Sequence, residues 1–184
     1  MSLTVSHGLD SPQPLPLAKT VLDRSVAAVL LLLAAPWMAL LAVALWRHDD
    51  GPVLRRDLRL GQWGRPFHQL RFRTTGPGGP VTGPCGALLR VACLDELPQL
   101  VNVLRGEMSL VGPRASTPTD GRRTPTTLAR VALRPGLVDP GPLDPVSTGA
   151  PGSAVDRYVR EWSLRLDLVI LGRALGRAVR GPAA

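Results

Sequence analysis

An uninterrupted apolar stretch is the strongest feature in the pattern of apolar and polar positions along this chain. Residues 26–46 read VAAVLLLLAAPWMALLAVALW and contain no charged side chain. As a helix the stretch would be about 31 Å long at ~1.5 Å per residue, enough to cross the hydrocarbon core of a bilayer. A buried helix of a soluble domain would carry a polar stripe, which this stretch lacks. The pattern therefore predicts a membrane helix over 26–46, after a polar, proline-rich tail at 1–18.

A proline in the middle of this stretch bears on how it meets the membrane. Pro36 removes a helical hydrogen bond and bends the helix, so the chain could enter and leave by the same face. Basic residues flank the stretch on both sides: Lys19 and Arg24 before it, and Arg47, Arg55, Arg56 and Arg59 after it. Because basic residues tend to stay in the cytoplasm, this pattern suits a helix with both ends on that side. The larger number after the stretch also allows a simple crossing. Pro36 favours the re-entrant form.

A second periodic stretch, CLDELPQLVNVLRGEMSLVGPRAS at 93–116, has helical spacing. Its apolar positions recur at intervals of three and four residues: Leu94, Leu97, Leu100, Val101 and Leu104. Gly106 is well placed to end this helix, and Pro98 is tolerated near its start. Asp95 and Glu96 form an adjacent acidic pair at its head, and Arg114 lies beyond its end. Glu96 could be a first-turn acid that suits the helix dipole, or the pair could be functional.

The last periodic stretch predicts a long helix over 155–180. Its leucines form one stripe, namely Leu164, Leu168, Leu171 and Leu175, and its other face ends in Arg173, Arg177 and Arg180. Such a helix could lie on a membrane surface or pack into the domain core. Together the three stretches predict a mainly α fold. It combines a re-entrant N-terminal membrane helix with a compact helical domain, amphipathic helices lying on the surface, and little β structure.

The segment between the first two stretches is basic and less regular. Leu58, Leu60, Phe67, Leu70 and Phe72 suggest short extended or helical pieces joined by GQWG. Arginines 55, 56, 59, 65, 71 and 73 line it. They form either a solvated basic face beside anionic lipid or a set of which some bind phosphate. Arg71 and Arg73 are the candidates for phosphate binding.

Composition adds limits rather than a function. The 184 residues suit one domain, and 22 basic against 14 acidic residues give a formal charge of +8. Such a surface suits anionic partners, including nucleic acid, acidic lipid headgroups and phosphorylated ligands. Lys19 is the only lysine, which points to a coding bias, so the basicity carries little weight. A nucleic-acid-binding protein is disfavoured because the arginines lack interleaved stacking aromatics and the apolar stretch is unexplained. Two cysteines fit a reducing compartment.

The stretch LDELPQLVNVLRGEMSLVGPR closely resembles the signature of the bacterial sugar transferases, the monotopic polyprenyl-phosphate phosphoglycosyl transferases. Other segments resemble the family in order: AKTVLDRSVAAVLLLLAAPWMALL, GPVLRRDLRLGQWGRPF, LRFRTT, LRPG and REWSLRLDLVIL. The resemblance implies one phosphoglycosyl transferase domain over 19–184, with its catalytic segment at 93–116. It is similar to the minimal form of the family.

This resemblance implies transfer of a sugar phosphate from a UDP-sugar to a polyprenyl phosphate, with UMP released and Mg²⁺ required. Asp95 matches the nucleophile that takes the phosphosugar covalently. Glu96 matches the residue that assists the metal or a proton transfer, so both carboxylates are metal candidates. Arg114 matches a phosphate clamp. The implied partners are the donor, the acceptor and the membrane, without nucleic acid and with a possible homo-oligomer. The implied location is the cytoplasmic face of the cell membrane, with a monotopic anchor.

Several positions depart from the family pattern. Cys93 stands where the family has Ser or Thr, Ala115 where it has Pro, Asp57 where it has Gln, and Ala87 where it has a basic residue. The segment LVDPGPLDP replaces a Gly-Trp-Ala-Gln run that helps to shape the substrate site. A second hypothesis therefore stays open, namely a catalytically silent relative that binds polyprenyl phosphate or a partner enzyme.

Overall fold

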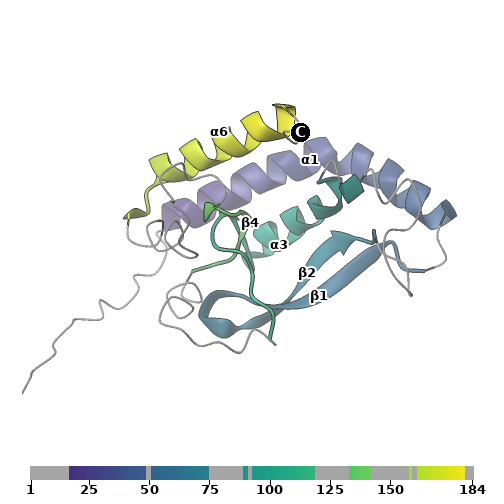
Figure 1. Cartoon of the computed structure of the whole chain (residues 1–184), viewed down its shortest axis with the longest axis horizontal. Helices are drawn as coiled ribbons and strands as arrows, with labels where there is room; N and C mark the ends of the chain where they lie inside the picture. The colour runs from purple at the N-terminus through teal and green to yellow at the C-terminus, as the bar shows by residue number, and fades with distance from the viewer. Residues whose placement is uncertain are drawn as a thin grey trace, which may run out of the picture.

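Helices form most of the described structure, and two pairs of strands complete it (Figure 1). The computed structural model describes residues 17–48, 51–74, 89–90, 93–118, 133–141, 158 and 161–180. In chain order its elements, with η for a 3-10 turn, are α1 (Leu17–His48), β1 (Leu54–Leu60), η1 (Gln62–Gly64), β2 (Pro66–Phe72), η2 (Leu94–Glu96), α3 (Gln99–Arg105), β3 (Ser109–Val111), β4 (Gly136–Val138) and α6 (Leu164–Arg180). The mainly α expectation is confirmed at this coarse level.

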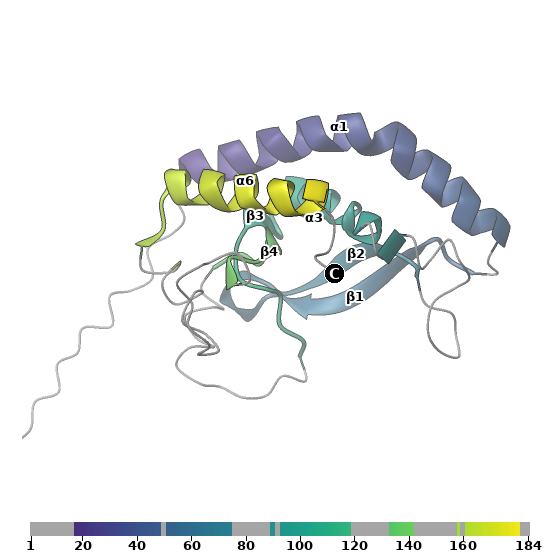
Figure 2. The same cartoon turned by 45° about the horizontal axis from the view of Figure 1, so that its top comes forward.

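The elements lie in layers that Figures 1 and 2 show from two sides. α1 and α6 run side by side along one face, the β1–β2 hairpin lies on the opposite face, and α3 lies between them. The buried core joins these layers through Ala27 of α1, Phe67 of β2, Val103 of α3, Leu110 of β3 and Ile170 of α6. The layers thus place α1 on the outside, with the hairpin on the side away from it.

Helix α1 contains the expected apolar stretch but begins earlier, at Leu17, and runs for 32 residues with Pro36 inside. Its inward positions follow helical spacing, which explains the early start: Lys19, Asp23, Ala27, Leu31, Met38, Leu41, Ala42 and Leu45 are buried or partly buried. The predicted tail at 1–18 therefore overlaps the helix by two residues, and residues 1–16 lie outside the described part. Figure 2 shows that the helix is bent.

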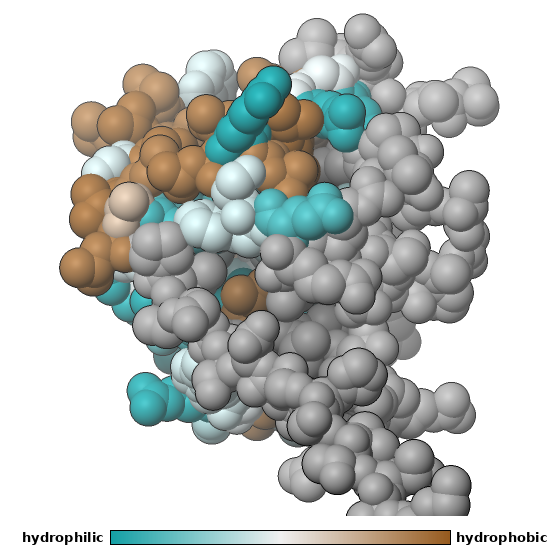
Figure 3. Space-filling model, turned by 90° about the vertical axis from the view of Figure 1, so that its left-hand side faces the viewer, coloured by the Kyte–Doolittle hydropathy of each residue, from teal (hydrophilic) through white to brown (hydrophobic). Residues whose placement is uncertain are grey.

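The outward face of α1 is apolar and open. Only 6% of its most apolar stretch is buried, and by length and composition the helix could cross a membrane. Large side chains on this face are exposed, among them Leu32, Leu33, Trp37, Leu40 and Trp46. In Figure 3, which views the molecule from the left-hand side of Figure 1, apolar residues gather in the upper part, at the level of α1 and α6. An exposed apolar surface of this size is typical of membrane contact.

The basic segment folds into an antiparallel hairpin, so its pieces are extended as one alternative predicted. Leu54 pairs with Phe72 and Leu60 with Pro66, and the chain reverses through Gly61–Arg65. Because strand side chains alternate, Arg55, Asp57 and Arg59 lie on one face together with Gln69 and Arg71. These five side chains therefore lie on the same face of the hairpin, and all of them line the pockets of the candidate site.

The catalytic segment forms two short pieces rather than the single helix that its spacing suggested. Residues 94–96 are a 3-10 turn, and α3 begins only at Gln99. Pro98, which lacks an N–H, stands as the N-cap of α3, so the helical hydrogen-bond ladder starts after it. Cys93 precedes the turn in the left-handed region with a φ of 54°, and its side chain makes no capping hydrogen bond. Gly106 ends α3 with a φ of 78°, as expected.

A buried asparagine attaches this segment to the hairpin. The Asn102 side chain is fully buried, and its Oδ1 accepts a hydrogen bond from the Leu70 backbone N–H at 3.0 Å. Its Nδ2 donates to the His68 carbonyl at 2.8 Å and to the Glu107 carboxylate at 2.6 Å. Asn102 therefore fixes α3 on β2 and sets the distance between the hairpin face and the acidic turn η2.

Beyond α3, the chain forms a parallel strand pair that the sequence did not predict. β3 pairs with β4, with Ser109 opposite Gly136 and Val111 opposite Val138. A Cβ on Gly112 would lie 2.5 Å from the Arg134 carbonyl oxygen, so only glycine allows this close approach. The pairing places Arg114, just after β3, next to the start of the segment that departs from the family.

The C-terminal helix is shorter than the predicted 155–180. α6 begins at Leu164, because residues 162–163 are not helical and the Ser163 hydroxyl accepts a hydrogen bond from the Leu166 N–H at 3.2 Å. Residues 155–157, 159–160 and most of the short helix considered at 128–133 lie outside the described part. The leucine stripe divides between the two alternatives, because Leu171 packs against the core while Leu168 and Leu175 are exposed.

A buried ion pair holds α6 against α1. The Lys19 ammonium lies 2.6 Å from the Asp167 carboxylate and 3.6 Å from that of Asp23. Asp167 also accepts hydrogen bonds from the Tyr158 hydroxyl at 2.7 Å and the Trp162 indole N–H at 3.2 Å. Burial and the negative charge of Asp167 raise the pKa of Tyr158, so this hydroxyl stays protonated as a donor.

We expect Lys19→Met to lower the free energy of unfolding by about 3–5 kcal/mol, because it leaves buried carboxylates without their cation. The matched control is Arg55→Met, since Arg55 and Asp57 are also 2.6 Å apart but the Arg55 side chain is 54% exposed. That exposed pair should contribute less than about 1 kcal/mol. Denaturant unfolding in detergent measures both variants. Equal losses would contradict a stabilising role for the buried pair.

Candidate active site

The acidic turn η2 faces the end of β2, and this contact brings the predicted site residues together. The Arg71 guanidinium donates a hydrogen bond to the Glu96 carboxylate, and the two form a partly buried ion pair. Asp95, next to Glu96, is buried, at 7% exposed. Its negative charge raises the pKa of Arg71, although burial of the guanidinium lowers that pKa more. Arg71 is therefore shared electrostatically by both carboxylates.

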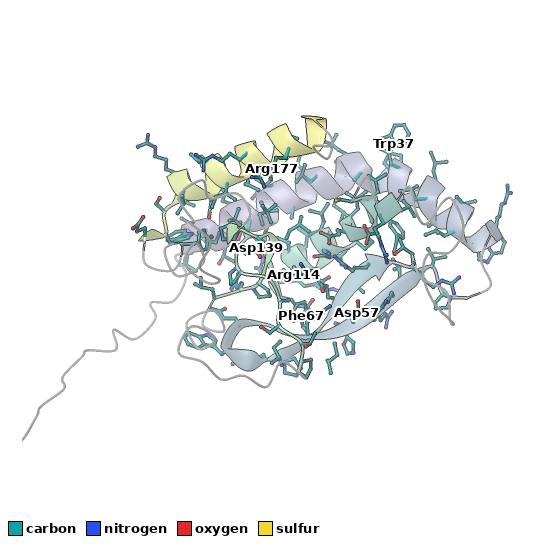
Figure 4. All side chains as sticks on the ribbon, viewed as in Figure 1. Trp37, Asp57, Phe67, Arg114, Asp139 and Arg177 are labelled. Atoms are coloured by element: carbon teal, nitrogen blue, oxygen red, sulfur yellow. The ribbon has the colours of Figure 1, made fainter. Side chains whose placement is uncertain are left out.

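Two pockets meet at the Arg71–Glu96 pair. The Asp95 pocket is lined by Arg55, Asp57, Arg71, Phe72, Thr74, Arg90, Cys93, Asp95 and Glu96. The Arg114 pocket is lined by Arg59, Gln69, Arg71, Glu96, Gln99, Arg114, Ala115, Gly136, Leu137 and Asp139. Figure 4 shows Arg114 and Asp139 near each other, and Asp57 further along the hairpin to the right, beyond Phe67. Since Arg71 and Glu96 line both pockets, their ion pair is the wall that the pockets share.

The Arg114 pocket contains buried hydrogen-bond donors that lack partners. Within the described part of the chain, this holds for Arg59 Nε, Arg71 Nε and Gln99 Nε2. Gln99 is held in place through its other atom, since its Oε1 accepts a hydrogen bond from Gln69 Nε2 at 2.9 Å. A buried donor without a partner costs about 1–3 kcal/mol, so a ligand with several acceptor oxygens would relieve the cost.

Positive charge is concentrated in the same pocket. The charges of Arg114 and Arg59 add to burial in lowering the pKa of Arg71, while Asp95 and Asp57 oppose them. Like charges repel one another in a confined site, and the resulting potential attracts anions. Guanidinium groups match the geometry of phosphate oxygens. The arrangement is therefore suited to a phosphate-containing ligand beside a buried carboxylate.

A divalent metal fits this site in one particular way. The described residues contain no group of three or more His, Cys, Asp or Glu side chains able to hold a metal ion. Mg²⁺, however, is commonly held by one or two carboxylates, with substrate phosphates and water completing its shell. Asp95 and Glu96 line the same pocket and could supply those carboxylates.

The structure separates two other predicted residues from these pockets. Arg73 ends the hairpin, where its backbone N–H donates to the Val53 carbonyl and its guanidinium lies against Gly51. It lines neither pocket, whereas Arg71 lines both. Pro36 lies on the exposed face of α1. Asp95, Glu96, Arg71 and Arg114 are thus the members of the predicted set that meet.

Several pocket residues were not singled out from the sequence. Arg59 was grouped with the arginines that could face lipid headgroups, yet it lines the Arg114 pocket. The period-two spacing of Arg55, Asp57 and Arg59 was the available signal, because it places them on one face of a strand. Two further pocket residues had no periodic signal in the sequence: Arg90, whose guanidinium donates to the Thr74 hydroxyl at 3.4 Å in the Asp95 pocket, and Asp139 in the Arg114 pocket.

Comparison with known proteins supplies the class of this protein. The family model described as Bacterial sugar transferase matches residues 15–181, so the chain belongs to that family. It is 39% identical to the UDP-glucose:undecaprenyl-phosphate glucose-1-phosphate transferase of Caulobacter vibrioides, over 86% of this chain and 68% of that protein. It is 32% identical to the undecaprenyl-phosphate glucose phosphotransferase of Komagataeibacter xylinus, over 89% and 36%. It is 31% identical to the exopolysaccharide production protein ExoY of Rhizobium meliloti, over 86% and 84%.

Proposed function

We propose that this chain transfers a sugar phosphate from a UDP-sugar to undecaprenyl phosphate and releases UMP. The observation that carries this proposal is the buried Asp95 carboxylate beside Arg71, next to a pocket with three unpartnered donors. The relatives' names, which specify undecaprenyl phosphate and in one case UDP-glucose, support the same reaction. They make UDP-glucose the first donor to test.

In the proposed first step, an Asp95 carboxylate oxygen attacks the phosphorus that carries the sugar. A phosphorus–oxygen bond to Asp95 forms, the bond to UMP breaks, and UMP leaves with the electron pair. In the second step, a phosphate oxygen of the lipid attacks the same phosphorus. The bond to Asp95 then breaks, which restores the carboxylate and yields the lipid diphosphate sugar.

The other residues have distinct roles in this scheme. Arg114, Arg59 and Arg71 would bind phosphate oxygens and stabilise the charge that accumulates during transfer. Glu96 orients Arg71 through their ion pair and could accept a proton or a metal. Mg²⁺, when bound through Asp95 and Glu96, would neutralise phosphate charge.

The central experiment is a UMP-release assay on the purified chain in detergent, with undecaprenyl phosphate and a panel of UDP-sugars. The proposal predicts release that depends on both donor and acceptor lipid. A chain that binds the lipid but releases UMP from no donor would instead be a silent relative. One observation favours that second function: Leu137 and Asp139, from the segment that departs from the family, line the Arg114 pocket itself.

We further propose that α1 is re-entrant and that the active site lies on the cytoplasmic face. The bend of α1, the internal Pro36 and the apolar outer face beside α6 support this arrangement. The test uses a chain in which Cys85 and Cys93 are replaced by Ser and Ser11 by Cys. We expect an impermeant maleimide to label Ser11→Cys only after the cells are opened. Adding Pro36→Leu should make α1 more prone to cross the membrane. Labelling of the Ser11→Cys chain that keeps Pro36, in intact cells, would refute the re-entrant form.

A further inference from the structure

A third pocket lies at the tip of the β1–β2 hairpin and shares no lining residue with the Asp95 or Arg114 pockets. Trp63 and Arg65 line it from the tip, Arg105 and Glu107 from the end of α3, and Arg134 from the chain before β4. We call it the hairpin-tip pocket. The proposed transfer reaction uses none of these residues.

Positive charge exceeds negative charge in the hairpin-tip pocket. A Cβ on Gly106, in the pocket wall, would lie 2.5 Å from Arg24 Nη2, so the Arg24 guanidinium lies against that wall. Burial and then the charge of Arg24 lower the pKa of Arg134, and only Asp23 opposes them. Among the residues that the structure describes, no carboxylate lies within ion-pair distance of Arg24, Arg65, Arg105 or Arg134. The four guanidinium groups therefore lack an anion of their own.

Neutral groups fix the most buried of these arginines. Arg134 Nε donates to Gln62 Oε1 at 3.3 Å, and its Nη1 donates to the Thr20 hydroxyl at 3.2 Å. These contacts hold the guanidinium in place without neutralising it. Glu107, the one acidic residue in the lining, accepts a hydrogen bond from Asn102 instead. A partly buried cation such as Arg134, with other cations near it, is stabilised by a bound anion, and the guanidinium group matches phosphate oxygens well.

The position of the pocket suits the membrane interface. Arg24 lies two residues before the uncharged stretch at 26–46, where the headgroups of a membrane around α1 would lie. Trp63 at the rim is 52% exposed and has a φ of 60°, which is unusual for a residue other than glycine. Such backbone outliers gather at binding sites, and tryptophan is enriched at membrane–water interfaces.

We propose that the hairpin-tip pocket binds a phosphate group, separately from the donor and acceptor of the transfer reaction. The phosphate can come from a membrane phospholipid headgroup or from a soluble phosphate. Both present anionic phosphate oxygens to Arg65, Arg105 and Arg134, and Trp63 at the rim would report binding through its fluorescence.

The experiment uses the full chain in a phosphate-free, non-ionic detergent and follows tryptophan fluorescence. One arm titrates inorganic phosphate, and the other titrates a short-chain phosphatidylglycerol. Subtracting the response of Trp63→Phe isolates the signal of the pocket. We expect saturable binding in at least one arm, and the arm that saturates at lower concentration identifies the source.

Arg65→Ala and Arg105→Ala, both at exposed positions, should each weaken this binding by about tenfold, the loss of one charge-assisted hydrogen bond. Arg114→Ala is the matched control, because it removes an arginine from the other pocket and should leave the Trp63 signal unchanged. No Trp63 response in either arm would overturn the proposal. So would a response that Arg65→Ala and Arg105→Ala leave intact.

Discussion

Asp95→Asn should reduce both UMP release and lipid product to below about one thousandth of the wild-type rate. The amide cannot form the bond to phosphorus, and the other carboxylates of the Asp95 pocket are already in ion pairs, Asp57 with Arg55 and Glu96 with Arg71. Glu96 is occupied by Arg71, and two consecutive residues of a helical turn point in different directions. Because Asn has nearly the same size and shape as Asp, the substitution should leave the fold intact. A coupled UMP assay and a thermal melt measure the two properties.

Glu96→Gln is the matched control for this prediction. It keeps the nucleophile but removes the charge that holds Arg71, so we expect slow but detectable turnover with an altered dependence on Mg²⁺. If Asp95→Asn retained appreciable activity while Glu96→Gln lost it, the roles assigned to the two carboxylates would have to be exchanged.

Arg114→Ala should lower kcat/KM by about a hundredfold, which corresponds to ~3 kcal/mol of transition-state stabilisation. Arg114 extends from the chain after β3 into a pocket where the other lining arginines are anchored on the hairpin. Removing it leaves the transferring phosphate bound from one side only. Steady-state kinetics with varied UDP-sugar measure the change.

Arg56→Ala is the control that the structure selects for Arg114. From the sequence alone, Arg55, Arg56 and Arg59 could each either face lipid headgroups or bind phosphate. Arg55 and Arg59 are unsuitable as controls, because Arg55 lines the Asp95 pocket and Arg59 the Arg114 pocket. Arg56 is exposed on the other face of β1. Equal losses from Arg56→Ala and Arg114→Ala would remove the special role of Arg114.

The sequence could predict those parts of the fold that depend only on residues close together in the chain. The apolar stretch in α1 and the end of α3 at Gly106 follow from residue type and spacing alone. The β3–β4 pair was missed because three-residue strands have no periodic signal and their partners are 27 residues apart. The Lys19–Asp167 pair joins residues separated by 148 positions, so no local sequence pattern could predict it.

Some residues of the candidate site could likewise be selected from the sequence, whereas others required the structure. Asp95, Glu96 and Arg114 stand in one contiguous motif, so resemblance to a family was enough to select them. Choosing Arg71 and Arg59 over their neighbours required the hairpin register, which a sequence with arginines on both strand faces leaves undecided. Gln99 has no distinguishing feature in the sequence, and only the structure shows that it is buried with an unpaired Nε2 in the lining of the Arg114 pocket.

The central claim is that Asp95 takes the phosphosugar covalently, and intact-protein mass spectrometry tests it most directly. The chain is mixed with UDP-sugar and Mg²⁺ in the absence of lipid acceptor and then quenched. We expect wild type to gain the mass of one sugar phosphate, peptide mapping to place it on Asp95, and Asp95→Asn to gain nothing. An adduct on Glu96, or an equal adduct on Asp95→Asn, would contradict the role of Asp95 as nucleophile.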